Sequence, residues 1–148
     1  MALTTKLSED LKAAMKGGDK PRVEVLRFVI AGVNSAQKEK GAKEAGAVLS
    51  DDEVVAILQK EAKRRKEAVD LFRQGKRDDL VAKEEVDLAI IYEYLPKELS
   101  KEELEAMVEK LKGEGFNEFN TLMRETMKLV KGRADGKLVG EVIKAKLG

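Results

Sequence analysis

Apolar residues recur along this chain at intervals of three and four positions, which is the spacing of one face of an α-helix. The stripe that starts with Leu3, Leu7 and Leu11 is typical, and the glycine pair after Lys16 ends it. No stretch alternates apolar and polar residues as a half-buried strand does. The pattern therefore predicts an all-α fold of seven helices, at about residues 3–16, 20–40, 51–74, 79–95, 100–113, 118–130 and 135–147.

Helix starts are marked by capping residues. Ser50 with Glu53, and Ser100 with Glu103, have the spacing of a capping box, in which a hydroxyl and a carboxylate bond reciprocally to backbone N–H groups. Asp19 is the expected N-cap of the second helix, because a proline follows in the first turn, where its missing N–H costs nothing. Thr4 or Thr5 is expected to cap the first helix, and Asp78 or Asp79 the fourth.

The width of the apolar stripe predicts which helices are most buried. In the second helix Val25, Phe28 and Val29 widen the stripe, so we expect this helix to be the most buried. In the later helices the spacing places further residues in the core, among them Val86, Met127 and Leu147. Glu61 and Glu67 are interspersed with the basic cluster Lys60–Arg65, and we expect this cluster to form a solvated helix face.

The dipeptide Leu95-Pro96 is the predicted domain boundary, because proline disfavours helix at the residue before it. Residues 1–95 would form an N-terminal four-helix lobe, and residues 96–148 a C-terminal three-helix bundle. Three short helices bury little surface, so we expect the smaller lobe to be only modestly stable alone.

Composition removes many kinds of chemistry. The chain has no cysteine and no histidine, which excludes disulfides, thiolate and imidazole metal ligands, and nucleophilic sites that use either residue. It contains neither phosphate-binding glycine motif of nucleotide enzymes. We expect no metal, no cofactor and no intrinsic catalysis. Without a long apolar run or a signal pattern, no membrane association is expected, and the cytoplasm is the expected compartment.

Charge is segregated within the C-terminal lobe, although the whole chain has a net charge of +1. Residues 97–118 carry 4 lysines and 7 glutamates, whereas residues 124–148 carry 7 basic and 3 acidic residues. The basic part includes a glycine-flanked turn before the last helix. A helix start with bare amides and nearby cations can bind phosphate. The candidate RNA-binding residues are Lys128, Lys131, Gly132, Arg133, Ala134, Asp135, Gly136 and Lys137.

A purely structural explanation of this turn stays open. Gly132 would let the chain leave one helix, and Asp135 would cap the next, without any ligand. The Asp135 carboxylate would also repel phosphate unless the cap occupies it. Spacing alone does not decide between the two interpretations.

Four segments resemble the YqeY-like proteins, in order and over essentially the whole chain. They are "LKAAMKGGDKPRVEVLRFV" (11–29), "GKRDDLVAKEE" (75–85), "EYLPKELSKEEL" (93–104) and "VKGRADGKLV" (130–139). One departure is Arg124, where the resemblance leads us to expect a small residue such as glycine.

The resemblance implies a two-lobed, all-helical protein. Its C-terminal lobe is similar to the tail domain of GatB, a subunit of the glutamine-dependent tRNA amidotransferase, and that tail contacts the outer corner of tRNA. It thus implies a non-catalytic tRNA-binding or amidotransferase-associated accessory protein. Two alternatives remain. One is a protein–protein adaptor for an amidotransferase or an aminoacyl-tRNA synthetase, and the other is the carbon–nitrogen ligase activity, with glutamine as nitrogen donor, that the family label carries.

Overall fold

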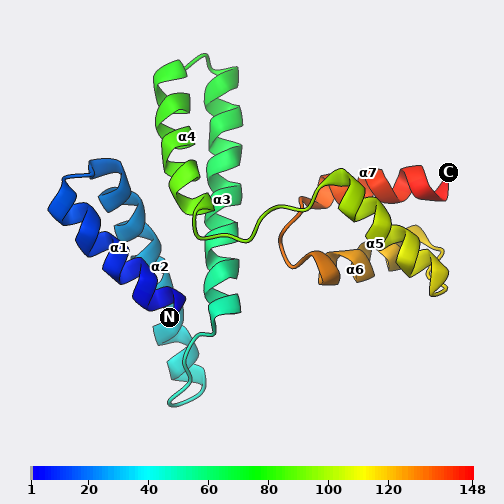
Figure 1. Cartoon of the computed structure of the whole chain (residues 1–148), viewed down its shortest axis with the longest axis horizontal. Helices are drawn as coiled ribbons and strands as arrows, with labels where there is room; N and C mark the ends of the chain where they lie inside the picture. The colour runs from blue at the N-terminus through cyan, green and yellow to red at the C-terminus, as the bar shows by residue number, and fades with distance from the viewer. Residues whose placement is uncertain (1) are drawn as a thin grey trace. The chain divides into compact units, whose positions relative to one another are not determined.

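The protein is all-α. The structure, a computed structural model, describes residues 2–148, and across them it contains seven α-helices and no β-strand, which confirms the predicted fold class. Figure 1 labels the helices in chain order. Their bounds are Leu3–Gly17 (α1), Lys20–Lys43 (α2), Asp51–Gln74 (α3), Asp78–Tyr92 (α4), Lys101–Gly113 (α5), Phe119–Val130 (α6) and Gly136–Leu147 (α7).

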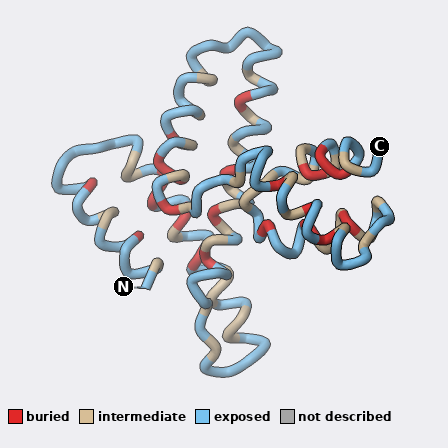
Figure 2. Tube along the Cα trace, turned by 45° about the vertical axis from the view of Figure 1, so that its right-hand side comes forward, coloured by how far each residue is buried: buried red, intermediate tan, exposed pale blue. Residues whose placement is uncertain are grey.

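The helices build two separate hydrophobic cores. Residues up to Leu95, the N-terminal unit, hold α1–α4, and residues from Pro96, the C-terminal unit, hold α5–α7. The first core is formed mainly by aliphatic side chains of all four helices, such as Leu58, and the second by those of α5–α7, such as Ile143. In Figure 2 the buried positions (red) are spread along the helices, while most connecting turns are exposed.

The strongest local signals form as predicted. The Asp19 carboxylate accepts a hydrogen bond from the Arg22 N–H (3.3 Å) at the start of α2. Ser50 and Glu53 form both bonds of the capping box of α3, each 3.1 Å long. These caps accept hydrogen bonds from first-turn N–H groups, which have no partner within the helix. The sequence therefore predicts the starts of α2 and α3 correctly.

The expected caps of the first and fourth helices are wrong. Ala2 is the N-cap of α1 and Arg77 is the N-cap of α4, and neither side chain forms a capping bond. At α1 the Leu3 N–H instead donates to the carboxylate of Asp51 (3.1 Å). A residue 48 positions away thus satisfies this amide, which no local pattern reveals.

Phe28 is not part of the core, contrary to the prediction for the second helix. Its side chain is 48% exposed, while its neighbours Leu26 and Val29 are buried. The guanidinium groups of Arg64 and Arg65 lie 5.1 and 5.6 Å from the centre of its ring. Contacts between a cation and an aromatic face are favourable at such distances, so α3 partly covers the ring with charge rather than with apolar groups.

Val86 is half exposed, and its neighbour Asp87 is buried in its place, with 3% of its surface accessible. The Asp87 carboxylate accepts hydrogen bonds from Arg65 Nη1 (3.1 Å) and from Lys83 Nζ (3.2 Å). Burying a carboxylate is costly unless it is paired and hydrogen-bonded. The prediction for Val86 fails because this ion pair, rather than an aliphatic contact, joins α4 to α3.

Two further core predictions in the C-terminal unit fail in a similar way. Met127 and Leu147 are 37% and 38% exposed, whereas the hydroxyl-bearing Thr126 is completely buried. The Thr126 hydroxyl oxygen has no hydrogen-bond partner. The buried stripe of α6 therefore runs through Leu122, Thr126 and Val130, with Thr126 in the core position that was expected for Met127.

The end of α4 is fastened to the first two helices by polar contacts. The buried Tyr94 donates a hydrogen bond from its hydroxyl to the Asp10 carboxylate, and Arg22 forms an ion pair with Glu93 (2.8 Å). The bond from Tyr94 holds the pKa of Asp10 below its usual value. Burial and this bond raise the pKa of Tyr94. None of the described helices is both long and apolar enough to cross a membrane.

Candidate nucleic-acid interface

The predicted site is the turn that connects α6 to α7. The residue after α6, Lys131, is in the left-handed conformation (φ 47°, ψ 45°), and Gly132 follows with φ 77°. Glycine adopts positive φ without a steric penalty, whereas a residue with a β-carbon is strained by about 1 kcal/mol. Two left-handed residues in succession end α6 and turn the chain back toward it.

Asp135 caps α7 as the sequence predicts. Its carboxylate accepts a hydrogen bond from the Lys137 N–H (3.1 Å), and its carbonyl accepts the bond from Val139 that begins the helix. The positive end of the α7 dipole therefore already faces one carboxylate. An incoming phosphate must approach beside Asp135, where the side chains of the turn contribute more than the bare amides.

Gly136 sits where the new helix meets the methionines of α6. A β-carbon added to it would lie 3.8 Å from the terminal methyl carbons of both Met123 and Met127, which is ordinary contact. Ala134 is half-buried against the same core. These small residues let α7 begin close to α6.

Arg133 is more firmly held than a surface cation. Its Nε donates a hydrogen bond to the carbonyl of Lys97 (2.8 Å), and its own carbonyl accepts one from the Leu99 N–H (2.8 Å). Arg133 therefore ties the turn to the segment that leads into α5. Only part of its guanidinium group remains to meet a ligand.

The other three predicted cations lie at the surface. Lys128, Lys131 and Lys137 are all exposed. Lys128 lies 3.4 Å from the Glu125 carboxylate, a surface ion pair that contributes little to stability. The structure thus brings Lys131, Arg133, Asp135 and Lys137 together at one turn, with Lys128 less than one helical turn away on α6.

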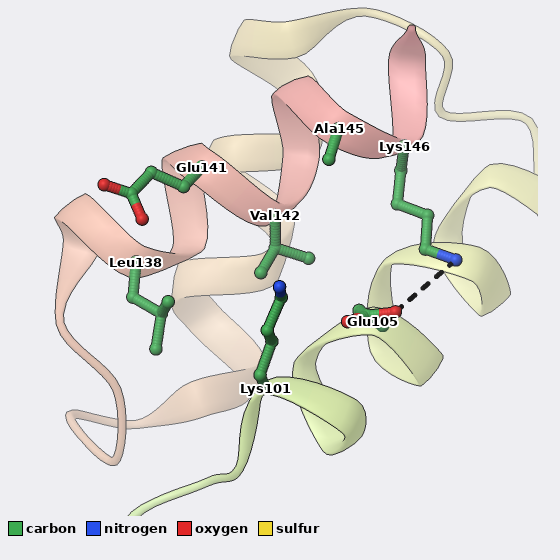
Figure 3. Close-up of a pocket in the computed structure, with 7 residues that line it drawn as sticks. All are labelled: Lys101, Glu105, Leu138, Glu141, Val142, Ala145 and Lys146. Carbon is green, nitrogen blue, oxygen red and sulfur yellow. Dashed lines mark ion pairs between the residues drawn. The ribbon is translucent and has the colours of Figure 1, made fainter.

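A groove between α5 and α7 was not predicted from the sequence. It has a volume of about 420 Å³ and an apolar floor of Leu138, Val142 and Ala145. In Figure 3 the Lys101 side chain reaches from the start of α5 toward Val142, and Lys146 pairs with Glu105 across the groove (3.9 Å). The groove lies on the α5 side of α7.

The N-terminal unit contains a polar cluster around Arg65, so the expectation of a solvated helix face over Lys60–Arg65 is wrong at this residue. Arg65, whose side chain is 13% exposed, bonds to the carboxylates of Glu61 (3.0 Å), Glu84 (3.3 Å) and Asp87 (3.1 Å). One feature of the sequence indicates that Asp87 is buried. It lies four residues before the buried Ile91 and is therefore on the same face of the helix. The described residues contain no group of acidic side chains placed to hold a metal ion.

Comparison with known proteins gives a consistent result. The family described as Yqey-like protein matches residues 4–147. A Pyrenophora tritici-repentis protein, altered inheritance of mitochondria protein 41, mitochondrial, is 30% identical over 150 aligned residues, which cover 97% of this chain and 80% of that protein. An uncharacterized protein of Schizosaccharomyces pombe is 29% identical over 94 residues, covering 64% of this chain and 72% of that protein.

Proposed function

The chain belongs to the YqeY-like family, and from this premise we propose that it is a tRNA-binding accessory protein. Its C-terminal unit would contact the phosphate backbone of tRNA, and no chemical step is assigned to the chain itself. The resemblance of this unit to the tail domain of GatB suggests association with a tRNA amidotransferase. The proposed compartment is the cytoplasm.

One observation carries the proposal. Lys131, Arg133 and Lys137 gather at the start of α7, in the half of the C-terminal unit that has an excess of positive charge. The Asp135 carboxylate is engaged by the Lys137 amide, so its charge is partly offset by the helix start. Cations beside a helix N-terminus favour phosphate oxygens over neutral ligands.

The residues at the turn favour contact with phosphates over reading of bases. None of the predicted site residues is aromatic, so the turn offers no surface on which an unpaired base would stack. Recognition would then depend on the shape of the folded RNA and the position of its phosphates. With three or four cations involved, the affinity should be modest and should fall steeply as salt is added.

Titration of labelled total tRNA tests the proposal. The variant Lys131→Gln/Lys137→Gln removes two positive charges from the turn, and Lys101→Gln/Lys110→Gln removes two from exposed positions of α5. We expect the first variant to bind about tenfold more weakly than wild type and the second to bind like wild type. Arg133 is left unchanged, because its replacement would also break the bond to Lys97. Equal binding by all three proteins would contradict the proposal.

The groove between α5 and α7 favours a second candidate function, that of a protein–protein adaptor. Its apolar floor, with Lys101 above it, suits a partner helix that carries an acidic residue beside aliphatic ones. A pull-down from native lysate with and without RNase separates the two functions. A protein partner that stays bound after RNase treatment and is lost from Ala145→Glu, a change at an exposed position of the groove, would support the adaptor.

A further inference from the structure

The contact between α6 and α7 runs as a seam across the C-terminal unit, starting at the proposed site. Gly136, Gly140 and Lys144 follow one another every four residues, so they lie along one side of α7. Met127, Met123 and Phe119 lie in the same way along α6, in the reverse direction. The two rows are in contact and the helices are antiparallel.

Three distances fix this arrangement. A β-carbon on Gly136 would lie 3.8 Å from the methyl groups of Met123 and Met127, and one on Gly140 would lie 3.9 Å from Cζ of Phe119. One turn further on, Lys144 Nζ lies 6.0 Å from the centre of the Phe119 ring. Lys144 therefore projects from the seam at the end remote from the turn.

Positive residues border the seam along its length. Lys131 and Lys137 flank the turn. Arg124 adjoins Met123, whose methyl group lies beside Gly136, so Arg124 is level with the first turn of α7. Lys144 comes seven residues after Lys137, which is about two helical turns or roughly 10 Å along α7. The four cations therefore border a strip that begins at the turn and ends at Lys144.

The acidic residues near this strip are few. Glu125 lies 3.7 Å from Arg124 and 3.4 Å from Lys128, both as exposed pairs. Glu141 lines the groove on the α5 side, and it also lies between Lys137 and Lys144, four residues after the first and three before the second. Glu118 precedes α6 at the far end, and Asp135 is used by the cap of α7. Along the length of the strip itself, the positive charges predominate.

From this geometry we infer that the RNA site extends beyond the turn along the α6–α7 seam, with Arg124 beside the start of α7 and Lys144 at the remote end as further phosphate contacts. The ligand is one phosphodiester strand of a folded RNA, lying over the glycine and methionine positions of the seam. Phosphates of one strand are spaced about 3.4 Å along a duplex axis, so the roughly 10 Å between Lys137 and Lys144 spans about three of them. This inference rests on the proposed function and adds residues to its site.

The role given to Arg124 accounts for the one departure from the family resemblance. A small residue was expected at this position, and the arginine is exposed rather than packed. Its side chain therefore adds charge to the strip without altering the core. A chain with a small residue here would keep three of the four cations.

The test compares three double variants of the full chain that each remove two positive charges. They are Arg124→Gln/Lys144→Gln along the seam, Lys131→Gln/Lys137→Gln at the turn, and Lys101→Gln/Lys110→Gln on α5. The altered side chains are exposed, and circular dichroism melts check that each variant is folded. Binding of labelled total tRNA is measured from 50 mM to 500 mM salt.

We expect Arg124→Gln/Lys144→Gln to bind tRNA about tenfold more weakly at 100 mM salt, and the slope of log affinity against log salt to fall by between about one and two. The α5 variant should stay within about twofold of wild type. If the turn variant is weakened while the seam variant, Arg124→Gln/Lys144→Gln, behaves like the α5 control, the extended site is wrong and the proposed function stands. If neither is weakened, both are wrong. Equal weakening of all three variants would show a general charge effect, and would overturn the extended site.

Discussion

The guanidinium Nε of Arg133 and the backbone carbonyl of Lys97 are joined by a 2.8 Å hydrogen bond. The carbonyl of the same arginine accepts the Leu99 N–H, also at 2.8 Å. One residue thus uses both its side chain and its backbone to hold the segment that leads into α5. The basic turn is therefore a structural element of the C-terminal unit in addition to its proposed role in binding.

The first prediction concerns this pair of bonds. Arg133→Met keeps the aliphatic part of the side chain and removes the bond to Lys97, and a single hydrogen bond contributes about 1 kcal/mol. We expect the free energy of unfolding, measured in urea, to fall by about that amount. Lys128→Met is the matched control, and should change it by less than about 0.5 kcal/mol, because the ion pair of Lys128 is exposed. If Lys128→Met lowers the free energy of unfolding as much as Arg133→Met does, the loss cannot be assigned to the hydrogen bond between Arg133 and Lys97.

The second prediction concerns the bond between Tyr94 and Asp10. The folded protein lowers the pKa of Asp10 below 3.8 and raises that of Tyr94 above 10. The stability linked to Asp10 is full above pH 3.8 and is lost as the pH falls through the lower folded value. The stability linked to Tyr94 is full below pH 10 and is lost as the pH rises toward the higher folded value.

Tyr94→Phe should therefore cost about 1.5 kcal/mol at pH 7, and the difference from wild type should shrink as the pH falls below 3.8 and as it rises above 10. Urea unfolding at a series of pH values measures this. Tyr92→Phe is the control and should follow the wild-type profile. A cost for Tyr94→Phe that does not change with pH would show that packing, rather than the hydrogen bond, is responsible.

The third prediction concerns the buried pair of Arg65 and Asp87. Arg65→Met leaves the Asp87 carboxylate buried without its guanidinium partner and should lower the free energy of unfolding by about 3 kcal/mol. Replacing both, as Arg65→Met/Asp87→Leu, removes the stranded charge and should recover most of that loss. Thermal and urea unfolding of the three proteins compare them. A double variant less stable than the single one would show that the pair is needed for more than mutual neutralisation.

The fourth prediction uses two glycines of α1 and α2. Gly32 lies in the middle of α2 with open space where a β-carbon would be, so Gly32→Ala should stabilise the protein by about 1 kcal/mol. Gly18 ends α1 with φ 70°, so Gly18→Ala should destabilise it by about the same amount. The opposite signs make each variant the control for the other, and differential scanning calorimetry measures both. Shifts of the same sign would contradict the conformational explanation.

Most features that depend on neighbours in sequence were predicted well, and the caps of α1 and α4 are the exceptions. The helix stripes, the Asp19 cap, the Ser50 capping box and the Asp135 cap are decided within a few residues. Periodicity and capping therefore sufficed for the fold class. At the candidate site they also predicted how the α6–α7 turn ends one helix and begins the next.

Features that depend on contacts between helices were not predicted. Asp87 is buried because Arg65 of another helix forms an ion pair with it. Phe28 lies outside the core because charged groups of α3, rather than apolar ones, pack against its ring. The bond from Arg133 to Lys97 joins residues 36 positions apart. Helical periodicity describes one helix at a time, so it cannot show which polar side chain will find a partner on another. The RNA contacts themselves stay a prediction until the titrations are made.

The separation of the two cores has a consequence for spectroscopy. The chain has no tryptophan, and both of its tyrosines, Tyr92 and Tyr94, belong to the N-terminal unit. Intrinsic tyrosine emission therefore monitors that unit alone, whereas far-ultraviolet circular dichroism sums the helices of both. Melting curves recorded with the two signals would coincide if the units unfold together and diverge if they do not, so the wild-type chain already contains its own optical label.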